Sequence, residues 1–465
     1  MRRIAANAGV LLAARGVRLA LSLGLTILLA RQLGAARYGY WVTLTALGGL
    51  LAPWIGLGTE KIAIRAGAGH PRGRRRWWGG AVLLRLPLGI LAAAALVVFA
   101  RVILGFRGEL LTTALLVGAI FLLNGLGEAG AVAYRLEERM GYEALVNTAK
   151  DLALFCLVCL VLAAGGGLLG VAWAYLGAAT FFVGLTVLVL RQRFFFPSWR
   201  VNPRFLFFLV KRGAPVAAAV FCNNFLDVSR ILVEILRGNR AAGRFGVAGL
   251  PFRGAELVAV SAAAAFFPLL SRRQKHLDRG RPQLRLATLI LAAIGLAWAL
   301  PACSVPRLLI EFAFSPDYAP AAPVLAILAA GSVLLAINHI QYGALVAGGR
   351  EKVFALIMAA AAAANILITL VLTRASGIVG AGIAAAALQL MLAVTLAGVI
   401  RRLYDGWPIS PRTGGLLLGF LVGVGGTRLL TWSGIPWGAA LAGGYLLYLP
   451  AAGKLLRDER KNVVG

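Results

Sequence analysis

Long apolar stretches separated by short polar segments run along the whole 465-residue chain. A helix crosses the hydrocarbon core of a bilayer in about 20 apolar residues, and fourteen stretches approach that length. Transmembrane β-strands are excluded, because they would alternate polar and apolar residues over about ten positions. We therefore predict an all-α polytopic membrane protein with about 14 transmembrane helices. The expected spans are residues 10–33, 40–66, 79–105, 110–134, 144–164, 168–190, 214–236, 245–270, 286–303, 321–347, 353–373, 377–400, 414–430 and 436–452.

Composition supports the membrane assignment. Apolar residues make up 60% of the chain and charged residues 14%, whereas soluble proteins average about 45–50% and about 25%. The 47 Lys and Arg against 17 Asp and Glu give a net charge of +30, which alone would suggest a nucleic-acid partner. Twenty-nine of the cations fall in segments expected inside, and eight fall outside. This is the positive-inside pattern, so we expect cytoplasmic termini and no nucleic acid.

Two short motifs recur at nearly the same offset. Residues 35–39 (AARYG) resemble 242–246 (AGRFG) at an offset of 207, and 167–171 (GLLGV) resemble 377–381 (GIVGA) at an offset of 210. Six crossings return the chain to its starting side, so two such copies are parallel. Two parallel six-helix lobes around a central cleft would suit alternating access. We expect a first lobe at 1–190, a cytoplasmic interfacial linker at 191–213, a second lobe at 214–400, and two further spans with a cytoplasmic tail at 401–465.

Basic and aromatic residues interleave in the linker, residues 191–213. One interpretation is a surface helix that lies against anionic headgroups. The other is a connector between the two lobes whose cations snorkel to the interface. The pattern favours the connector.

Charged residues inside the expected spans require a separate explanation, because each costs about 2.5–3.5 kcal/mol at a helix centre. Arg15 and Arg18 lie three residues apart on one helix face, and the first span contains no acid. A water-filled cavity or an anionic substrate would relieve this cost, and phosphate groups are natural partners of Arg. The alternative is pairing with acids of neighbouring helices, such as Glu60 or Glu128.

Catalytic chemistry has no recognisable motif in the sequence. No cluster with metal-ligand spacing, phosphate-binding loop or nucleophile elbow is present. We therefore expect no enzymatic activity, no cofactor and no metal site.

Several short motifs, spread over nearly the whole chain, resemble those of the polysaccharide and oligosaccharide flippase family. That family is the O-antigen flippase-like branch of the MATE-like (MOP) transporter superfamily. The motifs are 28–34 (LLARQLG), 38–41 (YGYW), 56–58 (GLG), 267–272 (FPLLSR), 316–323 (PDYAPAAP) and 362–365 (AAAN), followed by the GIVGA motif.

The resemblance implies a flippase that translocates polyprenyl-pyrophosphate-linked oligosaccharide for surface polysaccharide biosynthesis. It also implies a bacterial or archaeal cytoplasmic membrane, an anionic lipid-linked glycan as substrate, H⁺ or Na⁺ as coupling ion, and glycan polymerase or glycosyltransferases as partners. The candidates for a cationic substrate-binding cavity are Arg15, Arg18, Lys61, Arg65, Arg85 and Arg253. The candidates for ion coupling are Glu60, Glu128, Asp151, Asp227, Glu234 and Glu256.

Three other functions stay open. An ion-coupled multidrug exporter on the same scaffold would need acids in its cavity, and the first span has none. A lipid II flippase would differ only in its substrate. A membrane glycosyltransferase or polymerase generally needs acids or large domains outside, whereas the first outer loop, residues 31–39, contains no acid.

Overall fold

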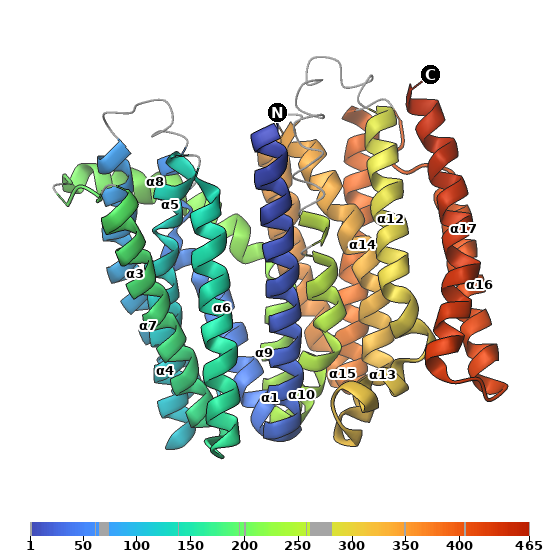
Figure 1. Ribbon diagram of the computed structural model, residues 1–465, viewed down its shortest axis with the longest axis horizontal. Helices are drawn as coiled ribbons and strands as arrows, with labels where there is room; N and C mark the ends of the chain where they lie inside the picture. The colour runs from blue at the N-terminus through green and yellow to red at the C-terminus, as the bar shows by residue number, and fades with distance from the viewer. Residues whose placement is uncertain are drawn as a thin grey trace. The chain divides into compact units, whose positions relative to one another are not determined.

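The computed structural model describes residues 2–60, 62–64, 74–137, 139–194, 196–199, 201–256, 258–260, 281–347, 350–403 and 406–464. Within these residues every regular element is helical and no strand occurs (Figure 1). The all-α prediction is therefore confirmed. The chain forms two compact units, Met1–Ile235 and Leu236–Gly465, and each is described by itself.

Unit 1 begins with a long helix that contains a sharp kink. Helix α1 (Arg2–Gly56) leaves helical geometry at Gly34, where φ is 69° and ψ is 168°. A side chain would disfavour that backbone conformation, and glycine has none. The kink separates the two expected spans 10–33 and 40–66. The second ends earlier than predicted, at Gly56, because Leu57 and Gly58 both have positive φ.

The rest of unit 1 follows the expected order of spans, with two short helices added. Its remaining helices are α3 (Arg74–Val102), α4 (Glu109–Glu128), α5 (Ala131–Leu136), α6 (Met140–Ala163), α7 (Gly167–Arg193) and α8 (Pro203–Asn223), followed by α9 (Phe225–Arg237), whose last two residues belong to unit 2.

Helix α8 occupies much of the expected linker. Asn202 caps it by accepting a 2.9 Å hydrogen bond from the Arg204 backbone nitrogen, and Pro203 suits the first helical position. Leu209 is fully buried, whereas Phe207 on the other face is 70% exposed. Figure 1 shows the start of α8 running across the upright helices of unit 1. This placement favours the surface-helix interpretation of the linker.

The expected span 214–236 is not one helix. Helix α8 ends at Asn223, and α9 begins after Asn224, which has φ −84° and ψ 49°. The Asn224 side chain donates a 3.0 Å hydrogen bond to the Gly49 carbonyl of α1. The sequence prediction of an unbroken helix was wrong here, because an apolar run does not reveal a break stabilised by a distant backbone group.

Unit 2 repeats the pattern of long helices joined by short connections. Its elements are α10 (Asn239–Ala248), α12 (Arg281–Ser304), α13 (Pro306–Ala313), the 3₁₀ helix η3 (Pro316–Ala321), α14 (Ala322–Ala347), α15 (Glu351–Leu403), α16 (Thr413–Trp432) and α17 (Trp437–Val464). The two expected C-terminal spans are confirmed as helices α16 and α17. The end of the expected span 245–270 lies outside the described residues.

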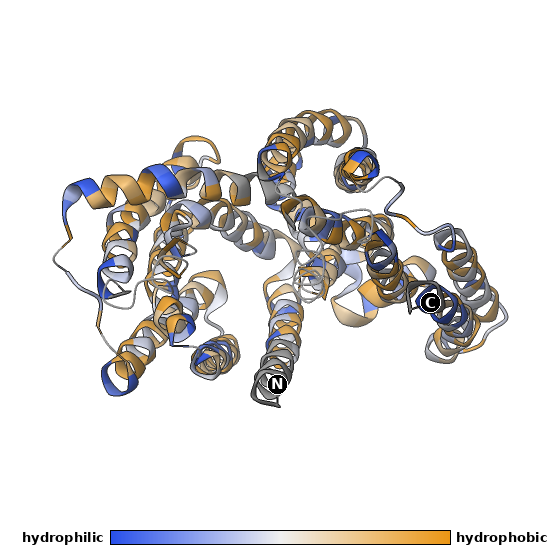
Figure 2. Cartoon of the chain, turned by 90° about the horizontal axis from the view of Figure 1, so that it is seen from above, coloured by the Kyte–Doolittle hydropathy of each residue, from blue (hydrophilic) through white to orange (hydrophobic). Residues whose placement is uncertain are grey.

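Ten helical segments among the described residues are long and apolar enough to cross a membrane. Two of them, Gly16–Gly56 and Lys352–Leu403, contain the kinks of α1 and α15. Large apolar side chains are exposed on these helices, including Leu91 at 67% and Leu160 at 68%. Figure 2 shows apolar residues along much of the length of the helices. Such surfaces suit a hydrocarbon solvent, and the protein is a multi-pass membrane protein.

The repeated glycine motif has the same local geometry in both units. Gly167 starts α7 with φ 56°, and Gly377 lies at the kink of α15 with φ 61°. Three residues later, Gly170 and Gly380 pack against the preceding helix. A Cβ atom on Gly170 would lie 2.7 Å from the Val161 Cγ1, and one on Gly380 would lie 1.8 Å from the Leu372 carbonyl oxygen. Close packing therefore accounts for the fourth residue of the motif.

The first testable prediction compares these two glycines. Gly380→Ala should destabilise the fold by about 3 kcal/mol, because backbone atoms cannot move aside. Gly170→Ala should cost about 1 kcal/mol, because the obstructing Val161 side chain can shift. Thermal unfolding of the purified protein in detergent measures both. Gly398→Ala on α15 is the control, because a Cβ atom there meets nothing within 4 Å. Equal melting temperatures for the Gly380 and Gly398 variants would contradict this explanation.

Candidate functional site

A polar pocket of about 250 Å³ lies within unit 1. Its charged lining comes from α1, from the turn after α1 and from α4, α5 and α6, and most of these side chains belong to helices expected to cross the membrane. The lining residues are Arg18, Glu60, Gly127, Glu128, Ala131, Tyr134, Arg135, Glu143, Val146, Asn147 and Phe182.

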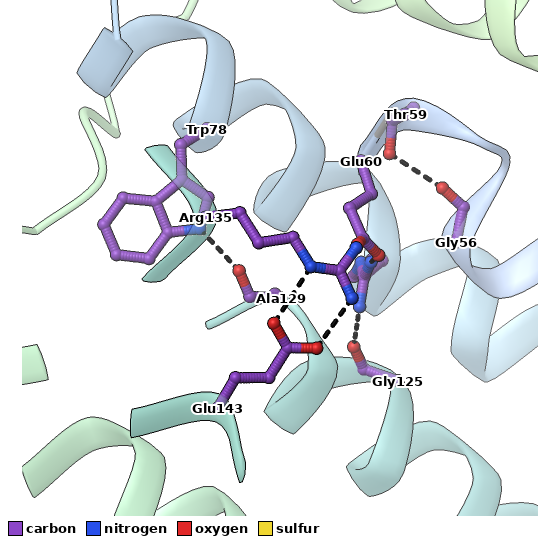
Figure 3. Close-up of polar contacts among 9 residues, drawn as sticks. Gly56, Thr59, Glu60, Trp78, Gly125, Ala129, Arg135 and Glu143 are labelled. Atoms are coloured by element: carbon purple, nitrogen blue, oxygen red, sulfur yellow. Dashed lines mark hydrogen bonds and ion pairs between the residues drawn. The ribbon is translucent and has the colours of Figure 1, made fainter. Parts of the chain in front are cut away.

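Arg135 of α5 is the most highly coordinated cation of the pocket. Its Nε and Nη2 donate to the two carboxylate oxygens of Glu143 at 2.9 and 2.7 Å, and its Nη1 donates to Glu60 (Figure 3). Paired parallel hydrogen bonds of this kind are the strongest arrangement between Arg and a carboxylate. All three guanidinium nitrogens of Arg135 are therefore engaged.

Glu60 joins Arg135 to a second, deeply buried cation. Its Oε2 lies 3.5 Å from the Nη2 of Arg85, a residue of α3 that is only 2% exposed. Arg85 also donates a hydrogen bond to the Gly125 carbonyl of α4. Burying an unpaired cation would cost several kcal/mol. Arg85 is thus stabilised as a structural ion pair, and Glu60 is shared between two cations.

Two local hydrogen bonds hold the backbone around this network. The Thr59 hydroxyl donates to the Gly56 carbonyl at 2.7 Å, which closes the turn after α1. The Trp78 indole nitrogen donates to the Ala129 carbonyl at 2.8 Å and joins α3 to the α4–α5 junction. Figure 3 shows both contacts beside Glu60 and Arg135. The Thr59 hydrogen bond therefore fixes the backbone next to Glu60, and the Trp78 hydrogen bond fixes the neighbouring helices that surround its carboxylate.

Arg18 of α1 has a different environment. Its Nε donates to Asp151 of α6 at 2.5 Å, and its side chain is 39% exposed. Lys150 lies 3.7 Å from the other oxygen of Asp151 and 4.8 Å above the Phe182 ring. Within the described residues, the two terminal nitrogens of Arg18 make no hydrogen bond or ion pair. Glu60 and Glu128, named as partners in the alternative to a cavity, line the same pocket, but the acid that Arg18 contacts is Asp151.

The other predicted residues are distributed more widely. Arg15 lies in α1, but its side chain lies outside the described residues, as do Lys61 and Arg65. In unit 2, Arg253 is exposed and Glu256 is half-buried. In unit 1, Asp227 accepts a 2.5 Å hydrogen bond from Arg230, three residues later on α9. Glu234 accepts instead from the Thr43 hydroxyl at 3.3 Å.

Residues 4–274 of the chain match the polysaccharide biosynthesis protein family. The chain belongs to this family. No sequence match to a curated protein was found.

Solved structures of MOP-superfamily transporters share the fold of this family member. The structure "Lipid II flippase MurJ, inward closed conformation" superimposes with a TM-score of 0.79 at 13% identity, covering 96% of this chain and 99% of that chain. An inward-facing multidrug resistance MATE family transporter gives a TM-score of 0.68 at 16% identity, covering 86% and 98%. A MOP superfamily transporter from Pyrococcus furiosus, described by a reverse polarity of its binding pocket, gives 0.57 at 14%, covering 86% and 94%. These likenesses show the fold.

Sequence reasoning missed two principal residues of the site in this family member. Arg135 and Glu143 lie between the expected spans 110–134 and 144–164, and neither is among the sequence-based candidates. A signal was present, because both residues flank the short connection between the fourth and fifth expected spans. Their pairing depends on how α5 turns into α6, which apolar periodicity does not specify.

The second prediction tests the shared carboxylate. Glu60→Gln should destabilise the protein by about 3 kcal/mol, because it leaves buried Arg85 without its anionic partner. Glu311→Gln removes the partner of Arg307 in an exposed pair, where the Arg side chain is 75% exposed, and should leave the melting temperature nearly unchanged because water screens such a pair. Thermal unfolding in detergent measures both variants. If the two variants melt at the same temperature, the ion pairs of Glu60 do not stabilise the fold as predicted.

Proposed function

We propose that this protein is a flippase that translocates polyprenyl-pyrophosphate-linked oligosaccharide across the cytoplasmic membrane by alternating access. It acts as a transporter without enzymatic chemistry and serves surface polysaccharide biosynthesis. Membership of the polysaccharide biosynthesis protein family and the MOP-transporter fold support a translocation role. The observation that carries the choice of an anionic substrate is Arg18, a partly exposed cation on a membrane helix with unengaged terminal nitrogens.

The chemistry of Arg18 suits a pyrophosphate. Asp151 engages only Nε and thereby orients the guanidinium plane, while Nη1 and Nη2 remain available to a ligand. A planar pair of donors matches two phosphate oxygens. Arg15 lies three residues earlier in α1, on the same helix face. The two residues would together supply two positive charges to a diphosphate.

The rest of the pocket does not compete for this role. Among its described lining residues, Arg135 is fully engaged by Glu60 and Glu143. Arg85 does not line the pocket, and its two terminal nitrogens are engaged by Glu60 and Gly125. The paired network therefore stabilises the helices around the pocket, and Arg18 is left for the substrate. Of the six cations proposed from the sequence, Arg18 is therefore the strongest candidate for binding the substrate.

Asp151 would provide a route to ion coupling. A bound pyrophosphate would compete with Asp151 for the Arg18 guanidinium. Such competition would free the Asp151 oxygen that Arg18 contacts, while Lys150 would remain 3.7 Å from the other oxygen, and a freed carboxylate oxygen can coordinate a cation. Arrival of the anionic substrate would thus favour uptake of the coupling ion at Asp151. Glu60, Glu128, Asp227, Glu234 and Glu256 remain further candidates.

The charge pattern and the proposed substrate also predict the membrane topology, the ligands and the partners of the protein. Both termini would lie in the cytoplasm, because the inside segments carry most of the Lys and Arg. The lipid-linked anionic glycan and membrane lipids would be the direct ligands. Glycosyltransferases or a glycan polymerase that act before and after translocation would be partners of the pathway.

The three carboxylates of the pocket favour a second candidate function. Glu60, Glu128 and Glu143 outnumber the two arginines of the described lining. An ion-coupled exporter of cationic compounds would use such carboxylates. Efflux of a cationic dye from proteoliposomes distinguishes the two functions. If the protein exports the dye but does not translocate the lipid-linked glycan, the exporter replaces the flippase as the proposed function.

The third prediction tests Arg18 directly. Arg18→Ala should reduce glycan translocation by at least about tenfold, because hydrogen bonds to a charged group contribute about 1.5–3 kcal/mol. Arg15→Ala should act in the same direction, and Arg18→Lys should retain partial activity because it keeps the charge but loses the planar donors. Complementation of a flippase-deficient strain, supported by transport into proteoliposomes, provides the measurement.

Arg107→Ala is the matched control, because Arg107 is an exposed cation in an expected outer loop. It should complement fully. The proposal fails if Arg18→Ala and Arg15→Ala both complement fully while their expression matches that of the unmodified protein.

A further inference from the structure

A second pocket, of about 440 Å³, lies within unit 2 and is separate from the charged pocket of unit 1. Its lining comes from residues near the two ends of the kinked helix α15. Arg350 and Val353 lie at its start, and Val394, Gly398 and Arg402 lie in its last turns. Because α15 is kinked at Gly377, residues nearly fifty positions apart line one groove.

The groove combines two cations with an apolar wall. Arg402 lies eight residues beyond Val394, which corresponds to about 12 Å along a helix. Val394 is 65% exposed, and Leu390, one turn earlier, is 54% exposed. The apolar surface therefore continues out of the groove along the helix. Arg350 and Arg402 belong to segments that the charge pattern predicts at the inner face of the membrane.

The two guanidinium groups are available to a ligand. Within the described residues, neither the Arg350 nor the Arg402 side chain has a hydrogen bond or ion pair, and both residues are exposed. The neighbouring Arg401 differs, because its guanidinium lies 4.9 Å above the Trp407 ring. No carboxylate is among the described residues that line the groove. Two positive charges therefore face a groove without a described counter-ion.

We propose that this groove binds an anionic glycerophospholipid of the surrounding bilayer. The lipid phosphate would lie between Arg350 and Arg402, since Arg donors match phosphate oxygens and basic pockets between transmembrane helices bind lipid headgroups. One acyl chain would follow Val394 and Leu390 toward the bilayer interior. The exposure of Val394 and Leu390, which continues the apolar surface along α15 beyond the groove, favours a bilayer lipid as the occupant. The site is independent of the function proposed for the pocket of unit 1.

The test measures binding of phosphatidylglycerol carrying a fluorescent acyl chain to the full-length protein in neutral detergent. The double variant Arg350→Gln/Arg402→Gln should weaken binding by at least about tenfold, because the charge-assisted hydrogen bonds to the lipid phosphate would be lost. The matched control, Lys352→Gln/Arg401→Gln, removes two charges from the same segments outside the groove lining. It should change binding by less than about twofold.

A steric variant tests the groove independently of charge. A Cβ atom on Gly398 meets nothing within 4 Å, so Gly398→Leu should fold normally while its side chain fills the groove. It should weaken phosphatidylglycerol binding about as strongly as the double arginine variant. An unchanged melting temperature shows that the loss does not come from unfolding.

Three results would overturn the proposal. Equal losses in the two double variants would show general attraction to a basic surface. Unchanged binding in the Arg350/Arg402 and Gly398 variants would show that phosphatidylglycerol binds elsewhere. Displacement of the probe by polyprenyl phosphate at a hundredfold lower concentration than by unlabelled phosphatidylglycerol would assign the groove to a substrate-type lipid. Failure of any flippase assay leaves this test unaffected, because it measures phospholipid binding alone.

Discussion

The exclusion of water from the bilayer core is the constraint on which this structure depends. Backbone polar groups in hydrocarbon must be satisfied within the protein, and every regular element of the described residues is accordingly a helix. The same constraint applies to charged side chains. Arg85 is tolerated at 2% exposure because Glu60 pairs with its charge and the Gly125 carbonyl accepts a hydrogen bond from it. The primary role of the charged network of unit 1 is therefore to replace the hydration that its buried side chains have lost.

Breaks in helices follow from the same constraint, because each break leaves carbonyl groups without intrahelical donors. At the kink of α15, Arg237 donates to the Thr373 and Arg374 carbonyls at 3.1 and 2.6 Å. At the end of α12, Arg428 donates to the Cys303 carbonyl at 2.9 Å. Within α12, Pro301 has no N–H to donate to the Ala297 carbonyl, and the Tyr445 hydroxyl of α17 donates to that carbonyl at 2.9 Å. Several polar residues in this apolar chain thus donate hydrogen bonds to backbone carbonyls, and this role explains their presence without a ligand.

The sequence predicted the helical class, the positions of most spans and the presence of intramembrane charge, because hydrophobic length is a local property. It did not predict which helices become neighbours. The alternative to a cavity named Glu60 or Glu128 as partners of the first-span arginines, whereas the partner of Arg18 is Asp151, 133 residues away. The break at Asn224 escaped prediction for the same reason, because it depends on the Gly49 carbonyl of another helix. Local periodicity contains no information on either contact.

Formal charge alone therefore does not identify a binding site in this protein. The number of guanidinium nitrogens already bonded to carboxylates is a better criterion. Arg135 and Arg18 line one pocket and carry the same charge, but all the nitrogens of Arg135 are bonded to carboxylates, whereas Arg18 is held through Nε alone. A ligand phosphate would have to break two carboxylate contacts to reach Arg135, at a cost of several kcal/mol. At Arg18 it would add to an existing contact or displace a single one. The less completely paired cation is the one suited to a substrate that must bind and then leave.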